Sequence, residues 1–309
     1  MDDTLDPTQA MRPEIKRRSF VGLSASLAGL AGSGGAIAAA LAAGDDFGKP
    51  HAPIVAENDP ALTVERPQLS YALQGANRAL GAYAASPAKP SGNARGVVIV
   101  QTIWGLDAQL RDVVRRFAKE GYVTIAPDLY AGLGAPSGDA ATDIGAFRDA
   151  AGKLSDETID GDLGAGARWI AAQPGSAKVG VIGFCMGGSH ALRQTVDQPD
   201  RFAAAAVFYG KVRYGTTGDN GAITPIALAY ADEIRVPVVG SFGGRDTGIL
   251  PADVRALDQR LSTLRKPHDI KIYDEAGHGF FDDTRPSYVA SAAADAWTRT
   301  LSWFARYLA

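Results

Sequence analysis

The sequence predicts an α/β fold, a three-layer sandwich with a mostly parallel central sheet. From Leu80 to the C-terminus, short apolar runs alternate with amphipathic stretches, and this alternation is typical of successive βαβ units. Several of the apolar runs are continuous blocks of Val and Ile, which indicates parallel strands that are buried on both faces. Helices should therefore cover both faces of a single sheet.

Each expected element corresponds to one of these runs or stretches. The expected strands are Leu80–Ala84, Val97–Gln101, Tyr122–Ala126, Lys178–Ile182, Ala205–Tyr209, Val236–Ser241 and Asp269–Tyr273. The expected helices are Gln109–Glu120, Thr158–Ala172, Gly188–Val196, Ala252–Leu264 and Tyr288–Leu308. In the last helix, an apolar stripe of Ala296, Leu301, Phe304 and Leu308 should face the core.

Composition limits the class of protein. The 31 basic and 34 acidic residues give a net charge of −3, which excludes a strongly basic nucleic-acid binder. With 46% apolar and 21% charged residues, the composition is that of a globular protein and not of a disordered one. A single Cys excludes an internal disulfide framework and a Cys-rich zinc site. Because the sequence contains no nucleotide, flavin or metal motif, we expect no cofactor and no metal.

The first 44 residues have the layout of a signal peptide. Lys16, Arg17 and Arg18 precede an uncharged stretch that ends in a small-residue run at 38–44. The Arg pair, followed one residue later by Phe20, resembles a twin-arginine signal. Few residues of the stretch are bulky and apolar, so a lasting membrane span would be poorly stabilised. We expect export by the twin-arginine machinery to the periplasm or outside the cell, followed by cleavage; a retained anchor and a cytoplasmic extension are the alternatives.

The rest of the chain is expected to form one large domain, because α/β domains often exceed 200 residues. Residues 45–75 are rich in Pro, Ala and isolated charges without a clear period. We expect them to form a linker and an N-terminal arm on the domain surface. Residues 76–309 should form the domain itself.

A Gly-rich turn surrounds Cys185. The run Gly183-Phe184-Cys185-Met186-Gly187-Gly188 follows an expected strand and precedes an expected helix, which is the context of a nucleophile elbow. The glycines let neighbouring backbone pass close to the turn, and the helix N-terminus stabilises a thiolate and an adjacent oxyanion. The alternative is that Cys185 is a small buried residue at a tight turn.

Such a nucleophile needs an acid and a His, which follow it along the chain in that order in folds with this elbow. His278 lies in a Gly-flanked loop just past an expected strand. His51 falls in the linker, His190 on the helix after the elbow and His268 in a turn, so we expect no catalytic role for them. The acid candidate is Asp246, also just past a strand, although an Asp in a Gly-rich loop is most often a turn former.

These residues resemble the dienelactone hydrolase family, whose members are α/β-hydrolases with a Cys nucleophile. Five separated stretches carry the resemblance: Val98–Gly105, Glu120–Tyr130, Lys178–Gly188, Phe242–Asp246 and Tyr273–Phe280. The resemblance implies an α/β-hydrolase domain over residues 76–309. It also implies Cys185 as the nucleophile, His278 as general base and then acid, and Asp246 as the residue that holds the imidazole. The expected activity is cleavage of a small ester or lactone through a thioester intermediate.

The oxyanion hole is expected from backbone groups. The N–H of Met186, directly after the nucleophile, and the N–H of Ile103, after the strand that ends at Gln101, are the two donors. Trp104 and Tyr130 follow strand ends on the same sheet edge and should wall a pocket for an apolar ligand. Ordinary aromatic packing over the sheet edge is the alternative.

Two positions depart from the family pattern. Thr102 stands where well-known members have a Glu that contacts the resting Cys, and a hydroxyl cannot replace a carboxylate base near neutral pH. Cys185 must then rely on His278 and the helix N-terminus. Asp282 stands where those members place an Arg, so Arg285 or Arg148 would have to meet an anionic substrate.

Two other functions remain open. One is a ligand-binding or redox-responsive protein that keeps the fold and the thiol without turnover, which Thr102 favours. The other is an anchored structural protein, which only the N-terminal segment favours.

Overall fold

The structure is a computed structural model that describes residues 34–44, 47–89, 95–136, 144–174, 178–212, 215–217, 223–225 and 231–309. Most of the predicted signal peptide, including the Arg17-Arg18 pair, lies outside the described residues.

One nine-stranded sheet runs through the described chain, in the order β1-β3-β5-β4-β6-β7-β10-β11, with β2 paired to β3. These strands are β1 (Leu62–Glu65), β2 (Gln68–Leu73), β3 (Ala76–Pro87), β4 (Arg95–Val100), β5 (Tyr122–Pro127), β6 (Val179–Phe184), β7 (Ala204–Phe208), β10 (Val238–Gly243) and β11 (His268–Tyr273). All pairs from β5 to β11 are parallel, whereas the pairs that involve β3 are antiparallel. Two short strands, β8 (Gly215–Thr217) and β9 (Ile223–Pro225), pair separately.

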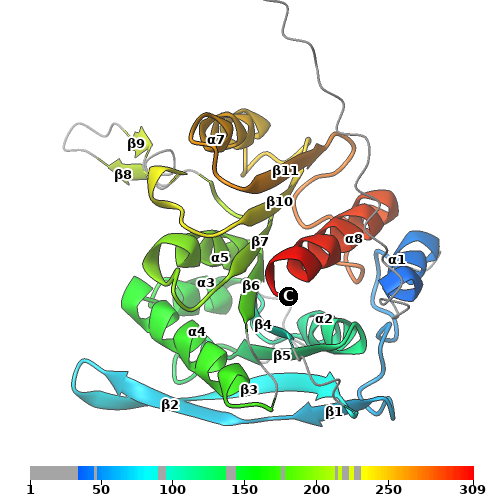
Figure 1. Ribbon diagram of the computed structural model, residues 1–309, viewed down its shortest axis with the longest axis vertical. Helices are drawn as coiled ribbons and strands as arrows, with labels where there is room; N and C mark the ends of the chain where they lie inside the picture. Colours follow the sequence, from blue (N-terminus) through cyan, green and yellow to red (C-terminus); the bar gives the residue numbers. More distant parts are fainter. Residues whose placement is uncertain are drawn as a thin grey trace, which may run out of the picture. The chain divides into compact units, whose positions relative to one another are not determined.

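Helices cover both faces of the sheet (Figure 1). Apolar residues of α4 (Asp156–Ala171), α5 (Met186–Asp197) and α7 (Pro251–Thr263) pack in one core cluster. Those of α1 (Gly34–Ala43), α2 (Ala108–Lys119) and α8 (Ala290–Tyr307) pack in a second cluster. The short helix α3 (Gly145–Ala151) packs with Tyr130 in a third. The structure therefore confirms the predicted three-layer α/β sandwich.

The Val and Ile runs predicted the parallel strands well. Every expected strand overlaps an observed one, and the five expected helices correspond to α2, α4, α5, α7 and α8. The expected stripe of the last helix is also present, because Ala296, Phe304 and Leu308 are buried and Leu301 packs against the same cluster.

The sheet begins earlier than expected, inside the range 45–75 that was predicted to be a linker and arm. β1 and β2 both lie in this range and pair antiparallel with β3. Their side chains alternate between more buried and exposed positions, since these strands lie at the sheet edge. Such short strands contain few bulky apolar residues, so no continuous Val and Ile block marks them.

The helix α1 falls within the predicted signal peptide and packs against α8. Leu41 is fully buried and Ile37 is 4% exposed. The hydroxyl of Tyr288, just before α8, donates to the carbonyl oxygen of Leu41. Among the helices in the described ranges, none is both long and apolar enough to cross a membrane.

Candidate active site

Cys185 lies in a strained turn between β6 and α5. Its backbone has φ 55° and ψ −118°, a conformation that L-residues rarely adopt. The N–H of Cys185 donates to the carbonyl oxygen of Phe208 at the end of β7, at 3.0 Å. Because Cys185 is the N-cap of α5, its side chain stands at the positive end of the helix dipole.

The glycines of the turn are required by close backbone contacts. A Cβ on Gly183 would lie 2.0 Å from the carbonyl oxygen of Gly187. A Cβ on Gly187 would lie 2.4 Å from the carbonyl oxygens of Val100 and Gln101, at the end of β4. The first turn of α5 is thus pressed against the neighbouring strand, as the elbow motif predicts.

Asp246 and His278 are joined directly. The Nδ1 atom of His278 lies 2.8 Å from Oδ2 of Asp246, and the other oxygen of Asp246 accepts the N–H groups of Gly248 and Ile249 at 2.8 and 2.9 Å. Burial alone would raise the pKa of Asp246, but the hydrogen bonds from His278 and from these backbone groups hold it below its ordinary value of 3.8. Asp246 therefore stays ionised, and it forms the expected turn as well as the contact with His278.

His278 carries a strongly perturbed pKa. Burial favours the neutral ring, but hydrogen bonds and charge interactions with Asp246 and Cys185 outweigh it and raise the pKa of His278 from 6.5 to about 10. The ring also packs edge-on against Tyr209, with 5.1 Å between the centroids. Asp246 and Cys185 thus both favour the protonated ring of His278.

The loop after β4 is held by side chains of the predicted site. The hydroxyl of Thr102 accepts the N–H of Trp104 at 3.1 Å. Tyr130 donates its hydroxyl to the carbonyl oxygen of Ile103 at 3.0 Å and lies 3.7 Å from Sδ of Met186. Tyr130 therefore contacts both residues whose N–H groups are expected to form the oxyanion hole.

Trp104 and Arg285 pack against each other beside this loop. The guanidinium of Arg285 lies 4.2 Å from the centroid of the Trp104 ring, and its Nε donates to Asp282 at 3.0 Å. Phe147 of α3 packs edge-on against Trp104. The neighbouring Arg148 is exposed on α3.

Comparison with known proteins identifies the family. The family model described as "Dienelactone hydrolase family" matches residues 80–308. The chain belongs to the dienelactone hydrolase family. It is an α/β-hydrolase of the ester- and lactone-hydrolase class.

Several proteins of the family are similar over most of this chain. A relative from Salmonella typhimurium, named "Putative carboxymethylenebutenolidase", is 36% identical over 73% of this chain and 82% of its own. "Carboxymethylenebutenolidase" from Rhodococcus opacus is 33% identical over 71% of this chain and 83% of its own. A solved structure, "Crystal Structure of Putative Dienelactone Hydrolase from Klebsiella pneumoniae subsp. pneumoniae MGH 78578", is 33% identical with a TM-score of 0.68, and the match covers 79% of this chain and all of that one.

Two residues near the candidate site were not predicted from the sequence. Tyr209 is predicted only as part of a strand, yet its ring packs on His278. It directly follows β7, at the sheet edge that carries the other candidate residues, and this position could have indicated a role in the site. Phe147 lies on a helix too short to give a clear periodicity.

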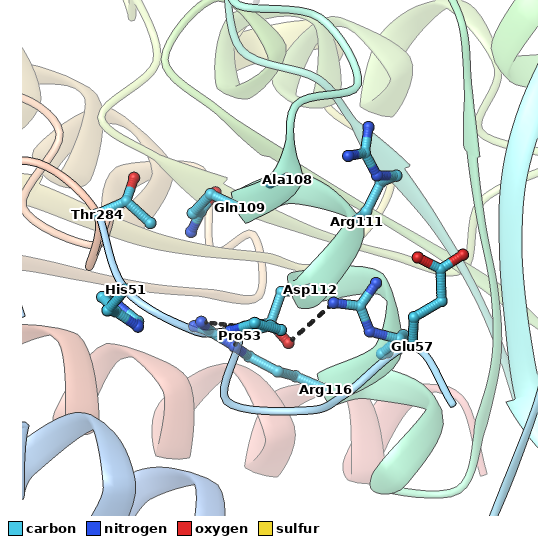
Figure 2. Close-up of a pocket in the computed structure, with 10 residues that line it drawn as sticks. His51, Pro53, Glu57, Ala108, Gln109, Arg111, Asp112, Arg116 and Thr284 are labelled. Atoms are coloured by element: carbon cyan, nitrogen blue, oxygen red, sulfur yellow. Dashed lines mark hydrogen bonds and ion pairs between the residues drawn. The ribbon is translucent and has the colours of Figure 1, made fainter. Parts of the chain in front are cut away.

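A cavity of about 160 Å³ lies elsewhere, between residues 51–57 and α2 (Figure 2). None of the predicted site residues lines it. Within the described ranges, no group of three His, Cys, Asp or Glu side chains is arranged to hold a metal ion.

Proposed function

We propose that this dienelactone hydrolase family member cleaves small esters or lactones with Cys185 as nucleophile, His278 as acid and base, and Asp246 as the residue that orients the imidazole. One observation carries the proposal. Asp246 lies 2.8 Å from Nδ1 of His278, whose pKa is raised by Asp246 and by Cys185, and Cys185 stands in a strained turn at the N-terminus of α5.

Acylation begins from the thiolate and the imidazolium. The sulfur of Cys185 attacks the substrate carbonyl carbon. The resulting oxyanion accepts hydrogen bonds from the N–H groups of Ile103 and Met186. The C–O bond then breaks as His278 gives its proton to the leaving alkoxide. The products of this step are an alcohol, a neutral imidazole and a thioester on Cys185.

Deacylation restores the starting state. Neutral His278 takes a proton from a water molecule, whose oxygen attacks the thioester carbon. The C–S bond breaks, the carboxylic acid leaves, and Cys185 and His278 return to thiolate and imidazolium. Asp246 keeps its contact with Nδ1 throughout, so that Nε2 carries the proton that moves.

Thr102 has a positioning role in this scheme. Its hydroxyl is engaged with the N–H of Trp104, which shapes the loop that presents the N–H of Ile103. Since no carboxylate stands at position 102, activation of Cys185 falls to His278 and to the N-terminus of α5.

Arg285 is the best-placed cation for a substrate that carries a carboxylate. It stacks on Trp104, whereas Arg148 is exposed on α3. Because Asp282 already pairs with Arg285, the attraction for an anion should be weaker than that of an unpaired guanidinium. The names of the relatives, carboxymethylenebutenolidases, are consistent with an anionic lactone as one substrate.

A series of p-nitrophenyl esters, assayed before and after alkylation of the thiol with iodoacetamide, tests the proposal. We expect turnover of small esters and its loss on alkylation of Cys185. Turnover that survives complete alkylation would contradict the role of the thiol. A protein that binds esters without turnover would favour the second candidate, a ligand-binding or redox-responsive member, for which Thr102 in place of Glu is the favouring observation.

We further propose that the chain is exported by the twin-arginine machinery and acts in the periplasm or outside the cell. The Arg17-Arg18 pair and the uncharged stretch after it support this placement.

A further inference from the structure

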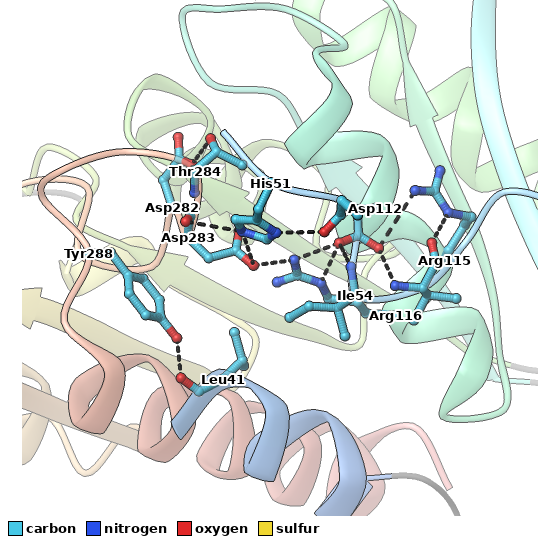
Figure 3. Close-up of polar contacts among 12 residues, drawn as sticks. Leu41, His51, Ile54, Asp112, Arg115, Arg116, Asp282, Asp283, Thr284 and Tyr288 are labelled. Carbon is cyan, nitrogen blue, oxygen red and sulfur yellow. Dashed lines mark hydrogen bonds and ion pairs between the residues drawn. The ribbon is translucent and has the colours of Figure 1, made fainter. Parts of the chain in front are cut away.

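Residues 47–55, which we name the N-terminal strap, lie against residues 279–289, the loop that follows His278 and that we name the histidine loop. The N–H of Gly48 donates to the carbonyl oxygen of Asp283 at 2.7 Å. Nε2 of His51 lies 3.1 Å from the same oxygen (Figure 3). Phe47 stacks on His51, with centroids 4.3 Å apart, and packs edge-on against Tyr288. The strap therefore contacts the histidine loop through both backbone and rings.

A buried charge network joins the strap, the histidine loop and α2. Arg116 of α2, which is 1% exposed, donates to Asp112 at 2.6 Å and to Asp283 at 2.5 Å. Asp112 in turn accepts the N–H groups of Ile54 and Val55 of the strap at 2.8 and 2.9 Å. Asp283 is fully buried, so its position follows that of its partners.

The strap is anchored by these contacts and by the packing of Phe47, Ile54 and Val55 in a core cluster. The cavity of about 160 Å³ lies between it and α2, and His51 and Pro53 of the strap line the cavity (Figure 2). Loss of the contacts of Phe47 and His51 should free the histidine loop, while Ile54 and Val55 stay bound to Asp112 and Val55 stays in the core cluster.

The histidine loop carries Arg285, the cation proposed above to meet a substrate carboxylate. Asp282, next to Asp283, accepts a hydrogen bond from Nε of Arg285. The guanidinium of Arg285 stacks on the ring of Trp104. The N–H of Asp282 donates to the carbonyl oxygen of Gly279, which directly follows His278. A shift of Asp283 is therefore transmitted within the same loop to Arg285 and to the neighbourhood of His278.

We propose that the N-terminal strap determines substrate selectivity by positioning Arg285 through Asp283 and Asp282. This inference rests on the proposed ester hydrolysis. Phe47 and His51 are positioning residues, since neither contacts Cys185 or His278. Release of the strap should weaken the binding of esters that carry a carboxylate more than the binding of neutral esters.

The test compares the double variant Phe47→Ala/His51→Ala with Asp59→Asn in the full-length chain. Asp59 is a matched control, because its carboxylate pairs with Lys119 of α2 and contacts no residue of the histidine loop. The substrates are p-nitrophenyl acetate and mono-p-nitrophenyl glutarate. In the double variant we expect KM for the glutarate to rise about tenfold and KM for the acetate to change by less than about twofold. The control should match the parent on both substrates.

Hydrogen–deuterium exchange provides a readout that does not need turnover. Amides of residues 279–289 should exchange faster in the double variant than in the parent, and at the parental rate in Asp59→Asn. Unchanged exchange in the double variant, or an equal rise of KM for both esters, would overturn the inference. If the parent cleaves neither ester, the proposed function fails, and the exchange result still decides whether the strap positions the loop.

Discussion

At the scale of single residues, Asp246 and Cys185 together raise the pKa of His278. The contact at 2.8 Å holds the pKa of Asp246 low and helps to raise that of His278. The sequence predicted this pairing, because an acid and a His each follow a strand in the order that the elbow requires. It did not predict the contact of Tyr209 with His278 or of His51 with Asp283, since no local pattern encodes side-chain pairs across distant segments.

The Asp246–His278 pair gives a defined pH dependence of stability. Because the pKa of His278 is raised from 6.5 to about 10, its contribution is complete below pH 6.5 and is lost as the pH rises through 10. Because the pKa of Asp246 is lowered from 3.8, its contribution is present above pH 3.8 and is lost on acidification below it. The pair should therefore stabilise the fold most between these limits.

Urea unfolding of the parent and of Asp246→Asn across this range measures the effect. We expect the free energy of unfolding of the parent to exceed that of the variant by the largest amount between pH 3.8 and 6.5, and the difference to shrink towards pH 10. A difference that stays constant from pH 5 to about pH 10 would show that the pair does not couple protonation to folding.

At the scale of elements, the elbow depends on the approach of α5 to β4. Gly187→Ala should destabilise the protein by about 3 kcal/mol, because the new Cβ would meet two backbone carbonyl oxygens that cannot move aside. Gly277→Ala is the control, since a Cβ there has open space. Thermal unfolding of both variants checks the prediction, and equal midpoints would refute the close contact.

The elements that the sequence predicted are those with strong local signals. Buried parallel strands such as β4 and β6 are continuous apolar blocks, and helices such as α2 show a clear amphipathic period. The strands β1 and β2 lack such a signal, because pairing with β3 stabilises them more than their own composition does. The helix α1 was hidden by its resemblance to a signal peptide.

At the scale of the whole molecule, we propose that the N-terminal segment directs export of the protein. We expect the Arg17→Lys/Arg18→Lys variant to remain as precursor in the cytoplasm, because Lys keeps the charge but not the guanidinium geometry. Cell fractionation followed by immunoblotting measures this. A periplasmic yield equal to that of the parent would exclude the twin-arginine route.

The central claim is that Cys185 forms a thioester during turnover. Its most direct measurement is mass spectrometry of the protein quenched with acid while it hydrolyses a p-nitrophenyl ester, with Cys185→Ala as the matched control. We predict an added acyl mass on the peptide that contains Cys185 in the parent, and neither adduct nor turnover in Cys185→Ala, whose fold should remain intact. Hydrolysis by Cys185→Ala at the parental rate would contradict the account.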